Sequence, residues 1–80
     1  MTKIPKSNKV IDCFGLLCPM PIVQTAKALM GMKKGEVLEV IADDEGIVSD
    51  MPSWCASTGN TFLGLDKQGT VYHVFVKKIK

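Results

Sequence analysis

The sequence predicts an α/β (α+β) domain, built as a two-layer sandwich in which two helices cover one face of a mixed four-stranded sheet. Segments rich in β-branched and aromatic residues alternate with segments of helical spacing, in the order β-α-β-α-β-β. The 80 residues suffice for one core, and the apolar fraction of 46% is above that of disordered chains. Elements this short bury their apolar faces best when helices pack on a sheet.

Residues 1–8 are predicted to be a disordered leader, and residues 9–80 a single domain. The strands are expected at residues 9–14, 36–42, 61–65 and 70–78, where Val, Ile, Phe, Tyr and Thr are frequent. The last two strands form a hairpin around the loop at residues 66–69.

The first helix is predicted from Pro19 to about Met32, because apolar side chains recur at steps of three and four residues. This stripe consists of Ile22, Val23, Ala26, Leu29 and Met30. The second helix ends at Gly59. Its regular part is expected to begin with Asp50 as the cap, since Pro52 is tolerated only in a first turn. Residues 46–49 add at most an irregular helical turn.

Composition excludes several functional classes. The net charge is only +2, and all ten basic residues are lysines, so the arginine forks that read nucleic acids are missing. No apolar run approaches the ~20 residues of a membrane span. The polar N-terminal residues are not followed by the apolar core of a secretory signal. We therefore expect a cytoplasmic protein with reduced cysteines and no membrane partner, and the sequence disfavours a nucleic acid as partner.

Cys18 is the candidate reactive residue. It lies in segment 15–21, which reads Gly-Leu-Leu-Cys-Pro-Met-Pro and precedes the first helix. Pro19 favours an extended backbone at Cys18, and proline is common at the first helical position. Cys18 is therefore expected to cap the helix, beside the positive end of its macrodipole. That position lowers a thiol pKa, and the thiolate is the nucleophile.

The flanking residues are predicted to hold and present this sulfur. Gly15 provides the turn, and Pro19 and Pro21 stiffen the first helical turn. With both proline amides absent, the amide of Met20 is expected to be the donor nearest to the sulfur. The Met20 side chain is a candidate for part of a docking surface. A chain this small has no room for a deep cavity, so the site is expected to be shallow and exposed.

The remaining candidates have simpler interpretations. Cys55 is predicted to be a core thiol, and Cys13 a strand residue of ordinary packing size. A Cys13–Cys18 redox pair is the alternative, although the two are not spaced as C-x-x-C. His73, the single histidine, is expected on an exposed strand face. The cysteines and His73 lack zinc-site spacing, so no metal and no cofactor are predicted. Acidic residues follow two predicted strands, and these are interpreted as solvated turn residues or a small acidic patch: Asp12, Asp43, Asp44 and Glu45.

Two blocks of the sequence resemble a known family. Residues 11–21, Ile-Asp-Cys-Phe-Gly-Leu-Leu-Cys-Pro-Met-Pro, are similar to the Leu/Ile-Asp-x-x-Gly-Leu-x-Cys-Pro-x-Pro signature of the TusA-like (SirA-like) sulfur-carrier family. Residues 50–59, with Pro52, Trp54, Cys55 and the terminal Gly59, resemble a second block of that family. The resemblance covers residues 9–78. It implies a fold like the C-terminal domain of translation initiation factor three.

The resemblance also implies a function. The cysteine matching Cys18 is expected to accept sulfane sulfur as a persulfide and to pass it on, with Pro19 and Pro21 as positioning residues. The expected partners are a cysteine desulfurase or rhodanese-type donor and an acceptor protein, docking around Leu17, Met20 and the first helical turn. The pathways served include tRNA thiolation, cofactor biosynthesis and sulfur oxidation, and such a carrier has no turnover of its own. Two alternatives stay open: an RNA-binding or regulatory module, and a thiol-redox protein that uses Cys13 and Cys18.

Overall fold

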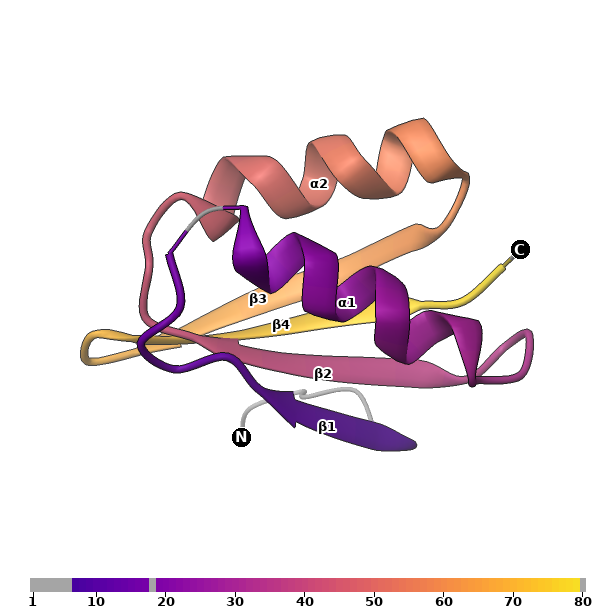
Figure 1. Ribbon diagram of the computed structural model, residues 1–80, viewed down its shortest axis with the longest axis horizontal. Coiled ribbons are helices and arrows are strands. Elements are labelled where there is room, and N and C mark those ends of the chain that lie inside the picture. Colours follow the sequence, from indigo (N-terminus) through magenta and orange to yellow (C-terminus); the bar gives the residue numbers. More distant parts are fainter. Residues whose placement is uncertain (1–6, 18, 80) are drawn as a thin grey trace.

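The computed structural model describes residues 7–17 and 19–79 (Figure 1). Six elements follow one another: β1 (Lys9–Asp12), α1 (Met20–Met30), β2 (Val37–Ala42), α2 (Ile47–Thr58), β3 (Thr61–Gln68) and β4 (Val71–Lys77). The predicted order β-α-β-α-β-β is confirmed.

The four strands form one mixed sheet in the order β1-β2-β4-β3. β1 pairs with β2 in parallel, whereas β4 pairs antiparallel with both β2 and β3. Both helices lie on the same face of this sheet (Figure 1). The predicted two-layer sandwich with a mixed sheet is therefore confirmed.

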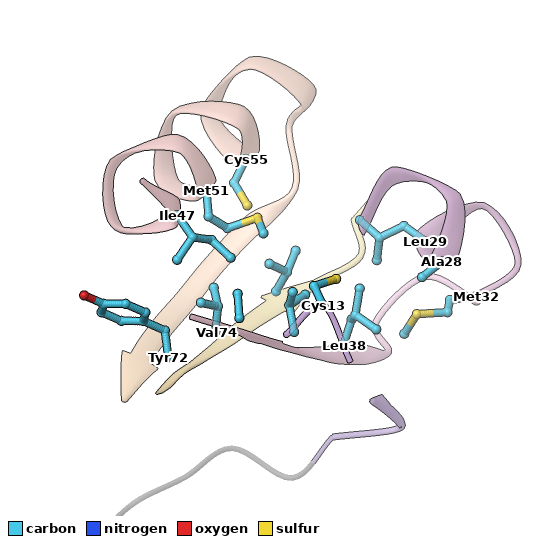
Figure 2. Packing of buried hydrophobic residues seen from close by; sticks show 13 residues of the cluster. Cys13, Ala28, Leu29, Met32, Leu38, Ile47, Met51, Cys55, Tyr72 and Val74 are labelled. Atoms are coloured by element: carbon cyan, nitrogen blue, oxygen red, sulfur yellow. The ribbon is translucent and has the colours of Figure 1, made fainter. Parts of the chain in front are cut away.

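The core lies between the helices and the covered face of the sheet (Figure 2). Alternate residues of β2 and β4 point into it, as the two-residue period of a strand requires, namely Leu38, Val40, Ala42, Tyr72, Val74 and Val76. α2 contributes a four-residue repeat of Ile47, Met51 and Cys55, all at most 2% exposed. This repeat places α2 firmly over the sheet.

α1 buries a different stripe from the predicted one. The buried residues of the helix are Pro21, Thr25, Ala28 and Leu29, whereas the predicted Val23 and Met30 are 37% and 81% exposed. The difference arises because Thr25 is buried despite its hydroxyl group. That hydroxyl donates to the Pro21 carbonyl at 2.7 Å, so burial leaves no unpaired polar group.

α2 begins at Ile47, three residues before the predicted cap. Gly46 is the N-cap, Asp50 lies within the first turn, and Pro52 lies inside the helix. The Asp44 carboxylate accepts a bond from the Gly46 amide at 3.4 Å, which helps to start the helix early. Burial of Ile47 and Met51 compensates for the one backbone bond that Pro52 cannot donate.

The β3–β4 hairpin is also tighter than predicted. β3 continues to Gln68, which pairs with Val71, so the connection is only Gly69 and Thr70. Gly69 has a φ of +63°, a conformation that glycine adopts without strain. The Lys67 ammonium lies 5.6 Å from the centre of the Tyr72 ring, a cross-strand contact that favours continued pairing.

Three connections gather at one end of the molecule: the β1–α1 segment, the β2–α2 turn and the β3–β4 hairpin (left in Figure 1). Both helices begin at this end, and we call it the carboxyl end because β1 and β2 finish there. The α1–β2 turn and the α2–β3 turn lie at the opposite end.

Candidate functional site

The predicted reactive residue belongs to the β1–α1 segment. Cys18 itself lies outside the described residues, but its neighbours on both sides, Leu17 and Pro19, are described. The site is therefore built from residues 13–17 and Pro19–Pro21, together with the side chains that hold them.

Three hydrogen bonds fasten the first half of this segment. The Cys13 amide donates to the Ile41 carbonyl at 2.7 Å, which extends the pairing of β1 with β2. The Phe14 amide donates to the Asp12 carboxylate at 2.9 Å, and the Gly15 amide donates to the Asp43 carboxylate at 2.8 Å. The last residue of β1 and the first residue after β2 thus supply the carboxylates that fix the path of the segment.

Gly15 is needed for its backbone conformation. Its φ is +84°, in the left-handed region that costs other residues about 1–2 kcal/mol. A Cβ added there would meet no atom within 4 Å, so space is not the constraint. After this turn, Leu16 packs against the core and leads the chain toward α1.

The start of α1 differs from the prediction by one residue. Pro19 is the N-cap and not the first helical residue, and its carbonyl accepts bonds from the amides of Ile22 and Val23, both at 3.1 Å. Met20 is the first residue of α1 and Pro21 the second. The cap position that was expected for Cys18 is thus taken by Pro19, and the Met20 amide donates to the Leu17 carbonyl at 2.8 Å. That amide is thus already paired, contrary to the expectation that it would serve the sulfur.

Apolar side chains surround the predicted site and face solvent. Phe14 is 58%, Leu17 72% and Met20 41% exposed. Exposed apolar groups of this size, close together along one segment, are typical of an interaction surface. That Cys18 itself lies in a shallow, open site stays a prediction, because Cys18 is outside the described residues.

The other two thiols are poor nucleophiles. Cys13 and Cys55 are each 1% exposed, and both are free (Figure 2). Burial raises the pKa of Cys55 to about 11. Burial, with a smaller effect of the Asp12 charge, raises the pKa of Cys13. Because the reactive species is the thiolate, these two residues have structural roles.

His73 does not join the site. Its Nδ1 lies 2.8 Å from a carboxylate oxygen of Glu39, on the sheet face that carries no helices. Glu39 on β2 and His73 on β4 each lie between two neighbours whose side chains point into the core. Because side chains alternate along a strand, both residues point to the opposite face of the sheet. His73 is therefore partly buried in an ion-pair geometry, rather than simply exposed as predicted.

Among the described residues, no group of three or more His, Cys, Asp or Glu side chains is arranged to hold a metal ion. Within the same residues, no helix is both long and apolar enough to cross a bilayer. An open groove of about 260 Å³ runs between the helices, lined by Ala26, Leu29, Met30, Trp54, Thr58, Asn60 and Lys78. It lies toward the helix C-termini, away from the β1–α1 segment.

The two anchoring carboxylates were not identified as site residues from the sequence. Asp12 carries a local signal, since an aspartate often accepts a bond from the amide two residues later. Asp43 carries none, because its partner Gly15 is 28 positions away and meets it only through the pairing of β1 with β2.

Comparison with known proteins places the chain in a family. The model of the family described as sulfurtransferase TusA matches residues 9–78. Two similar curated proteins come from Bacillus subtilis. The chain is 44% identical to the putative sulfur carrier protein YrkF, and the match covers 91% of this chain but only 40% of YrkF. It is 41% identical to the putative sulfur carrier protein YrkI, and that match covers 91% of this chain and 97% of YrkI. The sulfur carrier protein TusA of Allochromatium vinosum is 40% identical over 89% of this chain and 93% of that protein.

A solved structure supports the same assignment. The fold is similar to that of a SirA-like protein from Desulfitobacterium hafniense, with a TM-score of 0.77 and 25% identity. The match covers 90% of this chain and 99% of that chain. The chain spans less than half of YrkF, so the same unit also occurs within a longer relative. With a family model that matches nearly the whole chain, this protein belongs to the TusA sulfurtransferase family.

Proposed function

We propose that this protein is a sulfur carrier that accepts sulfane sulfur as a persulfide on Cys18 and relays it to an acceptor protein. The observation that carries the proposal is the family match over residues 9–78, within which Cys18-Pro19-Met20-Pro21 forms the motif. The names of the relatives, which are sulfur carrier proteins, support the same function.

The described surroundings of Cys18 support this assignment of roles. Gly15, Pro19 and Pro21 are positioning residues, since they set the turn and the start of α1. The exposed side chains of Leu17 and Met20 leave room for a protein to approach. A carrier needs such openness, because its sulfur must be reached first by a donor and then by an acceptor.

The proposed chemistry needs one nucleophilic sulfur and no general base. The Cys18 thiolate attacks the terminal sulfur of a donor persulfide, so a new S–S bond forms on Cys18 and the donor S–S bond breaks. The donor leaves as a thiolate, and the terminal sulfur keeps its proton, which balances the step without an external oxidant or reductant. In delivery, a thiolate of the acceptor attacks the terminal sulfur of the Cys18 persulfide, and Cys18 leaves as a thiolate.

The proposed donor is a cysteine desulfurase or a rhodanese-type protein, and the proposed setting is the cytoplasm, where thiols are kept reduced. The pathway served is tRNA thiolation, cofactor biosynthesis or sulfur oxidation. The protein works as a carrier without turnover of its own, and the proposal includes neither a cofactor nor a metal.

Intact-mass measurement after incubation with a cysteine desulfurase and cysteine tests this function. The wild-type protein should gain the mass of one sulfur atom, and cyanide should remove it as thiocyanate. Cys18→Ser should gain nothing, whereas the matched control Cys55→Ala should load like the wild type. Equal loading of Cys18→Ser would refute the proposal. RNA binding that weakens steeply with salt and survives in Cys18→Ser would instead favour the alternative RNA-binding module.

Burial of Cys13 argues against the redox alternative, because a 1% exposed thiol with a raised pKa exchanges slowly. A reversible Cys13–Cys18 disulfide, mapped by mass spectrometry under mild oxidant, would revive that alternative.

A further inference from the structure

The charges of this protein are separated along the direction of the strands. Six of the eight acidic residues lie at the carboxyl end: Asp12, Asp43, Asp44, Glu45, Asp50 and Asp66. Of the lysines in the described residues, only Lys67 lies at that end. Lys9, Lys33, Lys34, Lys77 and Lys78 belong to the opposite half, where β1 and β2 begin and β4 finishes. A chain with a net charge of +2 therefore has one distinctly acidic end.

The register of the sheet supports this placement. Asp12 pairs with Ile41, Ile41 with His73, and His73 with Asp66, so the two aspartates lie in one row across the sheet. Asp43, Asp44 and Glu45 come directly after β2, beyond that row. The acidic residues thus cross the carboxyl end from one edge of the sheet to the other.

Two of these carboxylates are bonded to the backbone of the segment that carries exposed apolar side chains. Asp12 and Asp43 bond to the amides of Phe14 and Gly15, so two charges are fixed against the segment that carries Phe14 and Leu17. The Met20 amide donates to the Leu17 carbonyl, so the exposed side chain of Met20 continues this apolar surface onto the first turn of α1. Val23, which is also exposed, extends the surface along α1. We call Phe14, Leu17, Met20 and Val23 the apolar centre, and Asp12, Asp43, Asp44 and Glu45 the acidic rim.

An apolar centre with a charged rim is the usual composition of a protein–protein interface. The charge of the rim determines which partner fits, since complementary potentials speed the encounter and like charges suppress it. An acidic rim repels RNA and anionic membrane surfaces from this end of the molecule. It favours a protein whose own contact surface is apolar and surrounded by Lys or Arg.

We propose that the apolar centre and the acidic rim form the docking surface for sulfur-exchanging proteins whose reactive cysteine is ringed by basic residues. The identity of the partners as sulfur-exchanging proteins rests on the proposed function. The charge preference rests only on the described residues. Donor and acceptor share the requirement, because both must reach the same segment.

Two synthetic peptides test the charge preference. Both carry the same Leu-Cys-Leu core, with the cysteine activated as a mixed disulfide with thionitrobenzoate, and they differ only in flanking lysines or glutamates. At low ionic strength the full-length protein should react with the lysine peptide at least about tenfold faster than with the glutamate peptide. The ratio should approach one at high salt, since screening removes the attraction. Equal rates at low salt, or a faster glutamate peptide, would overturn the proposal.

Two variants that each raise the net charge by one unit locate the effect. Glu45→Gln changes an exposed rim residue and should clearly reduce the rate ratio of the two peptides. Ser57→Lys adds the same charge near the end of α2, at the opposite end of the molecule, and should leave the ratio nearly unchanged. If both variants reduce the ratio equally, net charge and not the rim is responsible, and the proposal fails.

A binding measurement without a reactive thiol separates this proposal from the proposed function. Cys18→Ser is titrated with the lysine peptide in which serine replaces cysteine, and backbone amide NMR shifts are followed. Shifts should concentrate at Phe14, Leu17 and Met20. Absent shifts, or shifts at Lys34 and Lys77, would contradict the docking surface even if persulfide loading succeeds. A dimer in sedimentation that Glu45→Gln dissociates would show a second copy of the chain as the occupant, which also overturns the proposal.

Discussion

The carboxylate of Asp43 accepts a hydrogen bond from the Gly15 amide, with 2.8 Å between Oδ1 and the nitrogen. This contact joins the end of β2 to the segment that precedes α1. It holds the proposed site against the sheet, although the two residues are 28 positions apart in the sequence.

Asp43→Ala should therefore loosen the segment as well as lower stability. The free energy of unfolding is expected to fall by about 1 kcal/mol, because the Gly15 amide loses a charged acceptor. Urea denaturation measures this change, and amide hydrogen exchange at Gly15 should accelerate in the folded state. Glu45→Ala, which removes a nearby exposed carboxylate, is the control. It should change the free energy of unfolding by no more than about 0.5 kcal/mol and leave amide exchange at Gly15 unchanged. Unchanged exchange at Gly15 would mean that the Asp43 contact does not hold the segment.

Gly15→Ala should destabilise the fold by about 1 kcal/mol, because its φ of +84° is unfavourable for alanine. Gly31→Ala is the matched control. Gly31 ends α1 with a φ of −93°, and an added Cβ there meets only the Ala28 carbonyl oxygen at 3.9 Å. That substitution should be neutral or slightly stabilising. Equal destabilisation by the two variants, measured by urea denaturation, would contradict this role of Gly15.

The buried thiols predict a loss of stability at alkaline pH. Burial raises the pKa of Cys55 in the folded state to about 11, and after unfolding the pKa returns to its ordinary value of 9.0. The folded protein therefore holds this proton more tightly, so stability is fully present below the unfolded pKa and declines as pH rises toward 11. The slope approaches about 1.4 kcal/mol per pH unit for this thiol.

Unfolding free energies of the wild type and of Cys55→Ala, measured from pH 7 to 11, isolate this contribution, since lysines and Tyr72 titrate alike in both. The two curves should converge as pH rises above about 9. A constant difference across that range would show that Cys55 is not held protonated by burial.

Lys78 is expected to stabilise the end of α1. Its ammonium donates to the carbonyl of Leu29 and, at 2.7 Å, to that of Met32, at the end of α1 and just beyond it, where a positive charge also faces the negative end of the helix macrodipole. Lys78→Met should lower the free energy of unfolding by about 1–2 kcal/mol. Lys77→Met, the control in the neighbouring position, should have a smaller effect. If the two variants are equivalent in urea denaturation, the ammonium does not cap the helix.

Local patterns were sufficient to predict the fold but not the details of packing. Alternation of apolar residues in β2 and β4, and turn residues between elements, predicted the order of the elements along the chain and a four-stranded sheet, whereas the order of the strands within the sheet was not predicted. The buried face of α1 was placed wrongly, because Thr25 satisfies its hydroxyl on Pro21 and takes a core position that hydropathy assigns to apolar residues. The start of α2 was placed too late, because tertiary burial of Ile47 outweighs the cost of Pro52 inside the helix.

The site was predictable only where its signals are local. The order Gly-Leu-Leu-Cys-Pro-Met-Pro indicated a turn before a helix, and Gly15 and Pro21 fulfil those roles. Neither the bond from Gly15 to Asp43 nor the bond from Met20 to Leu17 could be predicted, since each depends on how the segment meets the strands and the helix. The sequence offered an acidic patch of Asp12, Asp43, Asp44 and Glu45 as one interpretation, but that Asp66 lies in the same row as Asp12 appears only once the strands are aligned.

Peptide mapping of the loaded wild-type protein tests the central claim most directly. The protein is incubated with a cysteine desulfurase and cysteine, blocked with iodoacetamide and digested without reductant, so that every cysteine reports its own state in one sample. The extra sulfur should be found on the peptide that contains Cys18, with the peptides of Cys13 and Cys55 free of it. An extra sulfur on Cys13 or Cys55, or spread evenly over all three cysteines, would contradict the account.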